Sequence, residues 1–167
     1  MLDQPVLNEP ARQLRARLED RSAKVAVIGV GYVGLPLLLA FNQARFPVLG
    51  VDVDPVKVAH LKAGRSYIGT IPSARLQAMN ADGAFDATTD FSRLGEADAI
   101  LICVPTPLDE AREPDLSYVI KTGEAIARHL RPGQLVSLES TTYPGTTEEV
   151  LKPILEASGL RADPQSF

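Results

Sequence analysis

The sequence has little cysteine: one residue, Cys103, in a chain of 167. A single cysteine excludes a disulfide within the chain and favours a reducing compartment. No apolar run approaches the roughly 18 residues that a membrane-spanning helix needs. The first residues also lack the pattern of a signal peptide. We therefore expect a cytoplasmic location, without a membrane as a partner.

The sequence also has fewer positively charged than negatively charged residues. Lysine and arginine total 17 against 21 aspartates and glutamates, so the formal net charge is −4. A chain with this balance has no basic field that would attract nucleic acid, and we expect no nucleic-acid partner. An anionic ligand would have to be held by local N–H groups and helix dipoles. We predict no metal site.

What the chain does contain is an apolar run over 25–28 that leads into Gly29-x-Gly31-x-x-Gly34. An apolar helical segment follows, and a second apolar run then ends in Asp52. Strand, glycines, helix and acid together form the fingerprint of a dinucleotide-binding site. The glycines alone would be weak support, because a glycine-rich turn without a ligand has the same pattern.

Each part of this pattern has a physical role. Gly29 allows the tight turn, Gly31 lets the backbone approach a pyrophosphate, and Gly34 lets the helix pack close to the sheet. Asp52 would accept hydrogen bonds from the ribose hydroxyls and repel a 2′-phosphate, which favours NAD over NADP. Lys57 could reach the adenosine side. Alternatively, Asp52 merely ends a strand.

Hydrophobic periodicity and turn residues predict the remaining elements. Strands are predicted over 24–29, 47–52, 84–88, 99–104 and 134–138. Helices are predicted over 11–21, over 33–44, from the Asp54 cap to about 64, after 71–73, from the Asp115 cap to about 130, and from a capping box at 146–149 to 159. Residues 1–10 are predicted to be loose and 108–114 to form a polar loop.

Strands that alternate with helices predict an α/β fold with a doubly wound parallel sheet in the order 3-2-1-4-5. The usual sixth strand is not found before Phe167. We therefore expect a fragment of a longer protein. Its predicted organisation is an N-terminal extension with a short helix over 1–23 and a nucleotide-binding domain over 24–167, long enough for one core.

Ligands of open parallel sheets lie beyond the carboxyl ends of the strands. Two further strand ends, 103–107 and 139–145, carry prolines and hydroxyls that suit fixed loops against a nucleotide. Two ordinary proline-rich turns would look the same. Cys103 ends an apolar run without a positive neighbour, so we interpret it as a small buried hydrophobe and not as a nucleophile.

Together these segments resemble the UDP-glucose/GDP-mannose dehydrogenase family, the nucleotide-sugar 6-dehydrogenases. The resemblance covers about residues 24–160. It rests on Gly29-x-Gly31-Tyr-Val-Gly-Leu-Pro36, Val51-Asp-x-Asp54, Cys103-Val-Pro-Thr-Pro107, Glu113-Pro-Asp-Leu-Ser-Tyr-Val119 and Glu139-Ser-Thr-Thr-Tyr-Pro-Gly-Thr146. The last two segments look most like the UDP-N-acetylglucosamine 6-dehydrogenase branch.

The resemblance implies a Rossmann-like domain that is the NAD-binding half of a larger enzyme. That family oxidises the C6 hydroxyl of a UDP-sugar to a carboxylate while two NAD are reduced. It implies a homodimer or larger assembly for the whole protein, and it places the catalytic cysteine and the sugar-binding half beyond Phe167. Cys103 does not match that cysteine. We expect this chain alone to bind NAD without turnover.

The resemblance also implies roles for individual residues. Tyr32 and Val33 would pack on the cofactor phosphates, and Thr106 would lie near the ribose or nicotinamide. Thr141 would lie at the nicotinamide and help to place a catalytic water, although its hydroxyl could instead bond to its own backbone. The candidate cofactor residues are Gly29, Gly31, Tyr32, Val33, Gly34, Asp52, Lys57, Val104, Pro105, Thr106 and Thr141.

Several alternatives stay open. The chain could belong to a UDP-glucose or GDP-mannose dehydrogenase, since the sugar pocket lies mostly outside it. It could also be a non-catalytic NAD-binding regulatory domain, although the missing sixth strand would then leave an apolar sheet edge exposed. A hydroxyacid dehydrogenase shares the glycines, but it is not expected to contain the 103–107 and 113–119 segments. Fold alone cannot choose among these.

Overall fold

The structure, a computed structural model, describes residues 8–108, 112 and 114–162. It contains a five-stranded sheet in the order β3-β2-β1-β4-β5. The strands are β1 (Val25–Ile28), β2 (Val48–Val51), β3 (Phe85–Thr88), β4 (Ala99–Ile102) and β5 (Leu135–Leu138). Every neighbouring pair is parallel, which confirms the predicted fold class and strand order.

The register of the three central strands positions the site. Ile28, the last residue of β1, lies opposite Val51 of β2 and Ile102 of β4. The residues that follow, Gly29 and Asp52 among them, therefore leave the sheet side by side at its carboxyl edge. This is the edge at which parallel α/β sheets bind ligands.

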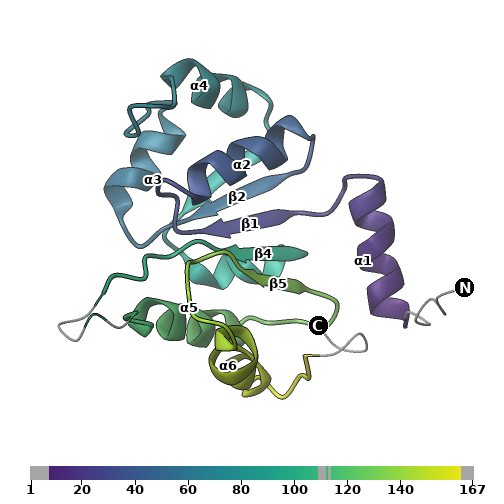
Figure 1. The fold of residues 1–167 in the computed structure, drawn as a ribbon. Coiled ribbons are helices and arrows are strands. Elements are labelled where there is room, and N and C mark those ends of the chain that lie inside the picture. The colour runs from purple at the N-terminus through teal and green to yellow at the C-terminus, as the bar shows by residue number, and fades with distance from the viewer. Residues whose placement is uncertain (1–7, 109–111, 113, 163–167) are drawn as a thin grey trace, which may run out of the picture.

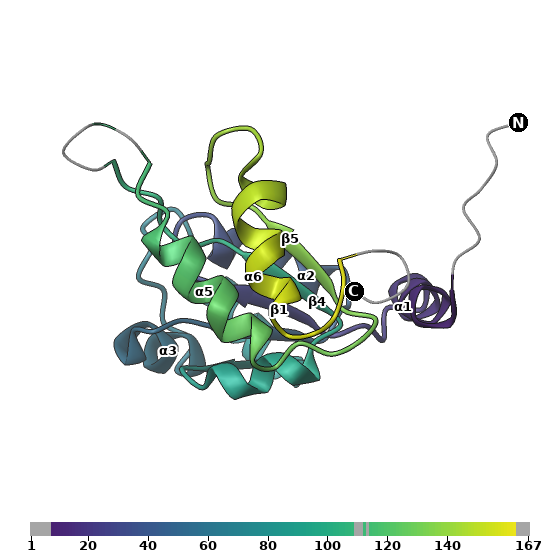
Figure 2. The same ribbon diagram turned by 90° about the horizontal axis from the view of Figure 1, so that it is seen from below.

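Helices cover both faces of the sheet, as Figures 1 and 2 show. One face is covered by α2 (Gly34–Gln43), α3 (Pro55–Lys62) and α4 (Ser73–Ala81). The other is covered by the 3-10 helix η1 (Phe91–Glu96), α5 (Ser117–Ala127), the π-helical turn η2 (Thr147–Leu151) and α6 (Lys152–Glu156). Helix α1 (Glu9–Glu19) lies apart from both layers, beyond the amino ends of the strands (Figure 1).

Side chains of the central strands alternate between two apolar cores. Val25 and Val27 pack on the α2 side, whereas Ala26 and Ile28 pack on the α5 side. All residues of β1, β2 and β4 are buried, as expected for parallel strands covered on both faces. β5 differs because it is an outermost strand, paired on one side only, and its Leu135 is 48% exposed.

Helix starts follow local signals at two places. The Asp54 side chain accepts a hydrogen bond from the Val56 N–H, which confirms the predicted cap of α3. The N-terminal helix begins two residues earlier than predicted, because Asn8 caps it and Pro10 fits in its first turn. Residues 8–10 are thus ordered in the helix and its cap, and the prediction for 1–7 lies outside the described residues.

Two other predicted helix starts are wrong in detail. Asp115 accepts a bond from the Ser117 N–H, but α5 begins at Ser117 and ends at Ala127, not near 130. The capping box at 146–149 is absent because the Thr146 hydroxyl donates to the Tyr143 carbonyl of the preceding loop. The segment begins as a π-helical turn instead, and α6 ends at Glu156, before 159.

In the part of the chain that the structure describes, no helix is both long enough and apolar enough to cross a membrane.

Candidate functional site

A cavity of about 940 Å³ lies at the carboxyl edge of the sheet. Loops that follow β1, β2, β4 and β5 line it, together with one side of α5. Its size is that of a small-molecule site. Every candidate residue except Gly34 contributes to the lining: Gly29, Gly31, Tyr32, Val33, Asp52, Lys57, Val104, Pro105, Thr106 and Thr141. The fold therefore brings together loops that are far apart in the sequence.

Gly34 lies outside the cavity lining because it is packed against the backbone. A Cβ on Gly34 would stand 2.0 Å from the Gly29 carbonyl oxygen. Gly29 has a φ of +85°, and a Cβ there would stand 2.6 Å from the Cys103 carbonyl oxygen. Both positions need glycine so that the turn can lie against β4 and α2 can lie against the turn.

Gly31 is different, because a Cβ on it would meet no atom within 4 Å. Its carbonyl accepts the first helical bond of α2, from the Leu35 N–H at 3.0 Å. The first N–H groups of a helix have no partner within the helix. In α2 these groups belong to the residues of the glycine loop. An open backbone surface with N–H groups at the positive end of a helix dipole fits a pyrophosphate.

Asp52 is almost fully buried, at 5% exposure, and its carboxylate already has protein partners. It accepts hydrogen bonds from the Val30 N–H at 3.0 Å and the Asp54 N–H at 2.9 Å, and Lys57 Nζ lies 3.3 Å away. A carboxylate offers about four acceptor positions, so about one is left for a ribose hydroxyl. The sequence indicated the ribose role but not that Asp52 also holds the glycine loop.

Tyr67 is a cavity residue that the sequence reasoning missed. It lies in the loop between α3 and α4, and its hydroxyl donates a hydrogen bond of 2.6 Å to the Val30 carbonyl. Burial, followed by the nearby carboxylates of Asp52 and Asp54, raises the pKa of this phenol. The hydroxyl therefore stays protonated and remains a donor. The surrounding sequence has no periodicity that would have singled it out.

Hydroxyl groups tie together the loops that follow β4 and β5. Thr106 Oγ1 donates to the Thr141 carbonyl at 2.7 Å, and Ser140 Oγ donates to the Val104 carbonyl at 2.7 Å. The Thr141 hydroxyl has no hydrogen-bond partner among the described residues, so the alternative of a bond to its own backbone is not seen. That hydroxyl is free to meet a ligand.

Cys103 is half-buried and packs against the core on the α2 side, in keeping with the predicted small hydrophobe, and it also lines the cavity. Burial, and then the Glu139 carboxylate, raise the pKa of the thiol to about 11. The thiol is neutral at pH 7 and has little nucleophilic character.

The sequence reasoning also missed one wall of the cavity, which α5 provides. Its members are Tyr118, Lys121, Thr122 and Ala125. These positions follow the i, i+3, i+4, i+7 spacing of a single helix face. That spacing could have indicated a shared surface, although not that the surface faces a ligand.

Comparisons with known proteins agree with this geometry. Residues 23–165 match the model of the UDP-glucose/GDP-mannose dehydrogenase family, NAD binding domain. The chain is 38% identical over 148 residues to a UDP-N-acetyl-D-glucosamine 6-dehydrogenase of Pseudomonas aeruginosa, covering 88% of this chain and 34% of the relative. It is 41% identical to a UDP-N-acetyl-D-mannosamine dehydrogenase of Campylobacter jejuni, covering 80% of this chain and 32% of the relative.

A solved structure gives the same result. The fold superposes on GDP-mannose dehydrogenase from Pseudomonas aeruginosa with a TM-score of 0.77 and 31% identity, covering 82% of this chain and 33% of that one. The chain thus spans about a third of the length of the relatives it matches. The chain belongs to the UDP-glucose/GDP-mannose dehydrogenase family, and the part of that family it represents is the NAD binding domain.

Proposed function

We propose that this chain is the cofactor half of a 6-dehydrogenase that oxidises the C6 hydroxyl of UDP-N-acetylglucosamine to a carboxylate while two NAD are reduced. The observation that carries this proposal is the similarity to the UDP-N-acetyl-D-glucosamine enzyme over 88% of the chain. The segments at 113–119 and 139–146 support the same branch. The same proposal includes a homodimer or larger assembly, which the family resemblance implies, and a cytoplasmic location, which the single cysteine favours.

The strand order supports an extended ligand that crosses the end of β1. Asp52 follows β2 on one side of β1, whereas Thr106 and Thr141 follow β4 and β5 on the other. Asp52 and Lys57 would hold the adenosine ribose, and the glycine loop between the two sides would hold the pyrophosphate. Thr141 would then meet the nicotinamide half and help to place a water molecule.

Exposed apolar side chains at the glycine loop fit the same arrangement. Tyr32 is 81% exposed and Val33 is 54% exposed, and both line the cavity. A bound dinucleotide would cover part of this surface, which is favourable by about 25 cal/mol for each Å² removed from water. Val104 and Pro105 would provide a stiff apolar wall beside it.

Bound NAD supplies the hydride acceptor, and the chain's own residues bind and orient it. Covalent catalysis is a different requirement, because it needs an activated nucleophile. The chain's single cysteine, Cys103, has a neutral thiol. We therefore expect this chain by itself to bind NAD without oxidising a sugar.

The test is NADH release by the full-length protein that contains this chain. UDP-N-acetylglucosamine, UDP-N-acetylmannosamine, UDP-glucose and GDP-mannose should be assayed in parallel. Two NADH for each UDP-N-acetylglucosamine would support the proposal. Release with UDP-glucose or GDP-mannose alone would contradict the substrate assignment. Turnover by the 167-residue chain itself would contradict the expectation that this chain binds NAD without oxidising a sugar.

A second substrate has a specific observation in its favour. The identity to the UDP-N-acetyl-D-mannosamine dehydrogenase of Campylobacter jejuni is 41%, although over a shorter alignment of 135 residues. If UDP-N-acetylmannosamine gives the faster release of NADH in that assay, this substrate replaces UDP-N-acetylglucosamine. The cofactor half would be unchanged.

A further inference from the structure

The two peptide groups around Val30 are each held by a residue from a different loop. The Val30 N–H donates to the Asp52 carboxylate at 3.0 Å, and the Val30 carbonyl accepts from the Tyr67 hydroxyl at 2.6 Å. The Val30 side chain is fully buried in the core on the α2 side. This residue, which lies between the first two glycines of the motif, is thus fixed through its backbone and its side chain.

The bond from Tyr67 has a consequence for the next residue. The Val30 carbonyl and the Gly31 N–H belong to one planar trans peptide, in which C=O and N–H point in opposite directions. Holding the carbonyl therefore sets the direction of the N–H. In the described part of the chain the Gly31 N–H has no partner, and Gly31 lines the cavity.

Tyr67 is itself held in place by contacts within the protein. The His60 ring packs beside it, with the ring centroids 6.1 Å apart and the planes tilted by 56°. The neighbouring Ser66 fixes the loop, because its N–H donates to Ser73 Oγ and its hydroxyl donates to the Ile68 carbonyl, both at 3.0 Å. The phenol therefore reaches the glycine loop from a preformed support.

We propose that Tyr67 is a positioning residue for the cofactor: its hydroxyl orients the Val30–Gly31 peptide so that the Gly31 N–H points at the pyrophosphate. Preorganised donors bind more tightly because no ordering is left to occur on binding. The inference needs only that the domain binds NAD, and it does not depend on which sugar the whole protein oxidises.

The variant Tyr67→Phe tests this, because it removes the hydroxyl and keeps the ring against His60. We expect the Kd for NAD, measured by calorimetry on the 167-residue chain, to rise about five- to tenfold, the effect of one hydrogen bond. The Kd for ADP-ribose should rise equally, because it has the same pyrophosphate. The Kd for adenosine, which has no phosphate, should stay within a factor of two.

Tyr143→Phe is the matched control. The Tyr143 ring is 42% exposed and lies outside the cavity lining, and its hydroxyl has no hydrogen-bond partner among the described residues. The same loss of one oxygen should leave the NAD Kd within a factor of two. An increase equal to that of Tyr67→Phe would overturn the proposal.

A second measurement follows the loop directly. Hydrogen exchange of a peptide that covers residues 29–35, recorded without ligand, should be faster in Tyr67→Phe than in Tyr143→Phe. An unchanged NAD Kd, with or without a lower melting temperature, would show that Tyr67 only packs its own loop. Equal weakening of NAD and adenosine would point to general damage to the cavity. Either result would overturn the positioning role.

Discussion

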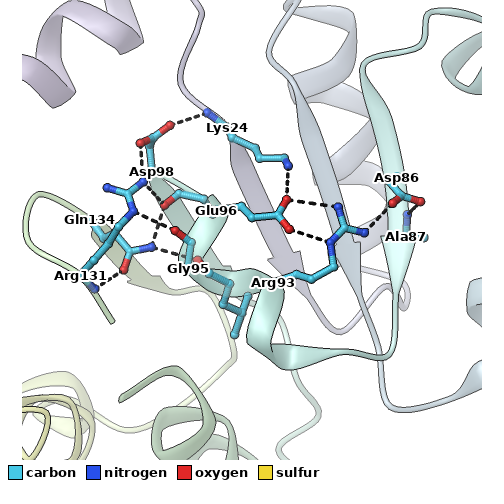
Figure 3. Close-up of polar contacts among 11 residues, drawn as sticks. Lys24, Asp86, Ala87, Arg93, Gly95, Glu96, Asp98, Arg131 and Gln134 are labelled. Atoms are coloured by element: carbon cyan, nitrogen blue, oxygen red, sulfur yellow. Dashed lines mark hydrogen bonds and ion pairs between the residues drawn. The ribbon is translucent and has the colours of Figure 1, made fainter. Parts of the chain in front are cut away.

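The amino edge of the sheet, where the parallel strands begin, and its carboxyl edge, where they end, differ in how their polar groups are satisfied. At the amino edge, charged and amide side chains bond to one another and to the backbone, as Figure 3 shows. At the carboxyl edge, the glycine loop and the loops after β4 and β5 surround an open cavity instead. Buried polar groups with protein partners stabilise a fold, whereas donors directed into a cavity are available to a ligand.

Asp98 is the centre of the amino edge. Its side chain is 3% exposed and accepts hydrogen bonds from the Lys24 N–H and from the guanidinium groups of Arg17 and Arg131. Gln134 Nε2 donates nearby to the Ala97 carbonyl. These bonds fasten α1 and the starts of β1, β4 and β5 to one another. The polar groups of Asp98 are therefore bonded within the protein itself.

We therefore expect changes at the amino edge to lower the stability of the fold and to leave the NAD affinity unchanged. Changes in the open part of the carboxyl edge should lower the NAD affinity and leave the stability unchanged. Gly34 lies at the same edge but is packed against the backbone, outside the open part, so the variant Gly34→Ala should affect stability and have the largest effect. Its Cβ would stand 2.0 Å from a backbone oxygen, so the free energy of unfolding should fall by about 3 kcal/mol or more. Thermal and urea unfolding measure this. A melting temperature equal to that of the parent would show that α2 can move away from the turn.

Asp98→Asn tests the amino edge. The amide keeps the shape but loses the charge that pairs with two arginines, both of which reach solvent. We expect a loss of about 1.5–3 kcal/mol in urea unfolding, with the NAD Kd of the folded protein unchanged. Glu124→Gln, at an exposed carboxylate without an ion pair in the described residues, is the control. A weaker NAD affinity in Asp98→Asn would show that the two edges are coupled.

Gly31→Ala tests the open carboxyl edge. The added methyl meets no protein atom within 4 Å, so the melting temperature should be unchanged. The NAD Kd should rise about tenfold or more, because the methyl would lie where we propose that the pyrophosphate approaches. Gly69→Ala adds a methyl that also meets nothing within 4 Å, outside the cavity lining, and should change neither quantity. Loss of stability in Gly31→Ala would mean that this glycine serves packing, as Gly34 does.

The smallest predicted effect is a pH dependence at the amino edge. Hydrogen bonds from Arg93, and then from Lys24, lower the pKa of Glu96 from 4.5 to about 2. Because the folded pKa is the lower one, this stabilisation is present above pH 4.5 and is lost as the pH falls towards 2. The Glu96 side chain is 42% exposed, so the loss should be under about 1 kcal/mol.

The melting temperature of Glu96→Gln, recorded from pH 6 to pH 2.5, checks this dependence. The difference between the parent and Glu96→Gln should shrink as the pH falls. A difference that stays constant over this range would show that the ion pairs of Glu96 contribute nothing measurable.

Much of the fold could be predicted from the sequence because the signals are local. Apolar runs give the strands, and the Asp54-Pro55 pair gives the start of α3. The start of the last helical segment could not be predicted in the same way. The Thr146 hydroxyl can bond either forward to the helix or back to the Tyr143 carbonyl, and the loop decides which bond forms.

The candidate site likewise has some features that local sequence signals predict and others that depend on tertiary contacts. The sequence by itself determined the glycines, the acid at the end of β2 and the loops after β4 and β5, because each depends on neighbours within a few residues. The partners of those residues were decided only by the tertiary structure. Tyr67 and Val30 are 37 positions apart, and Lys24 and Asp98 are 74 apart. No local pattern records such a contact, because it exists only once the sheet has brought the loops to a common edge.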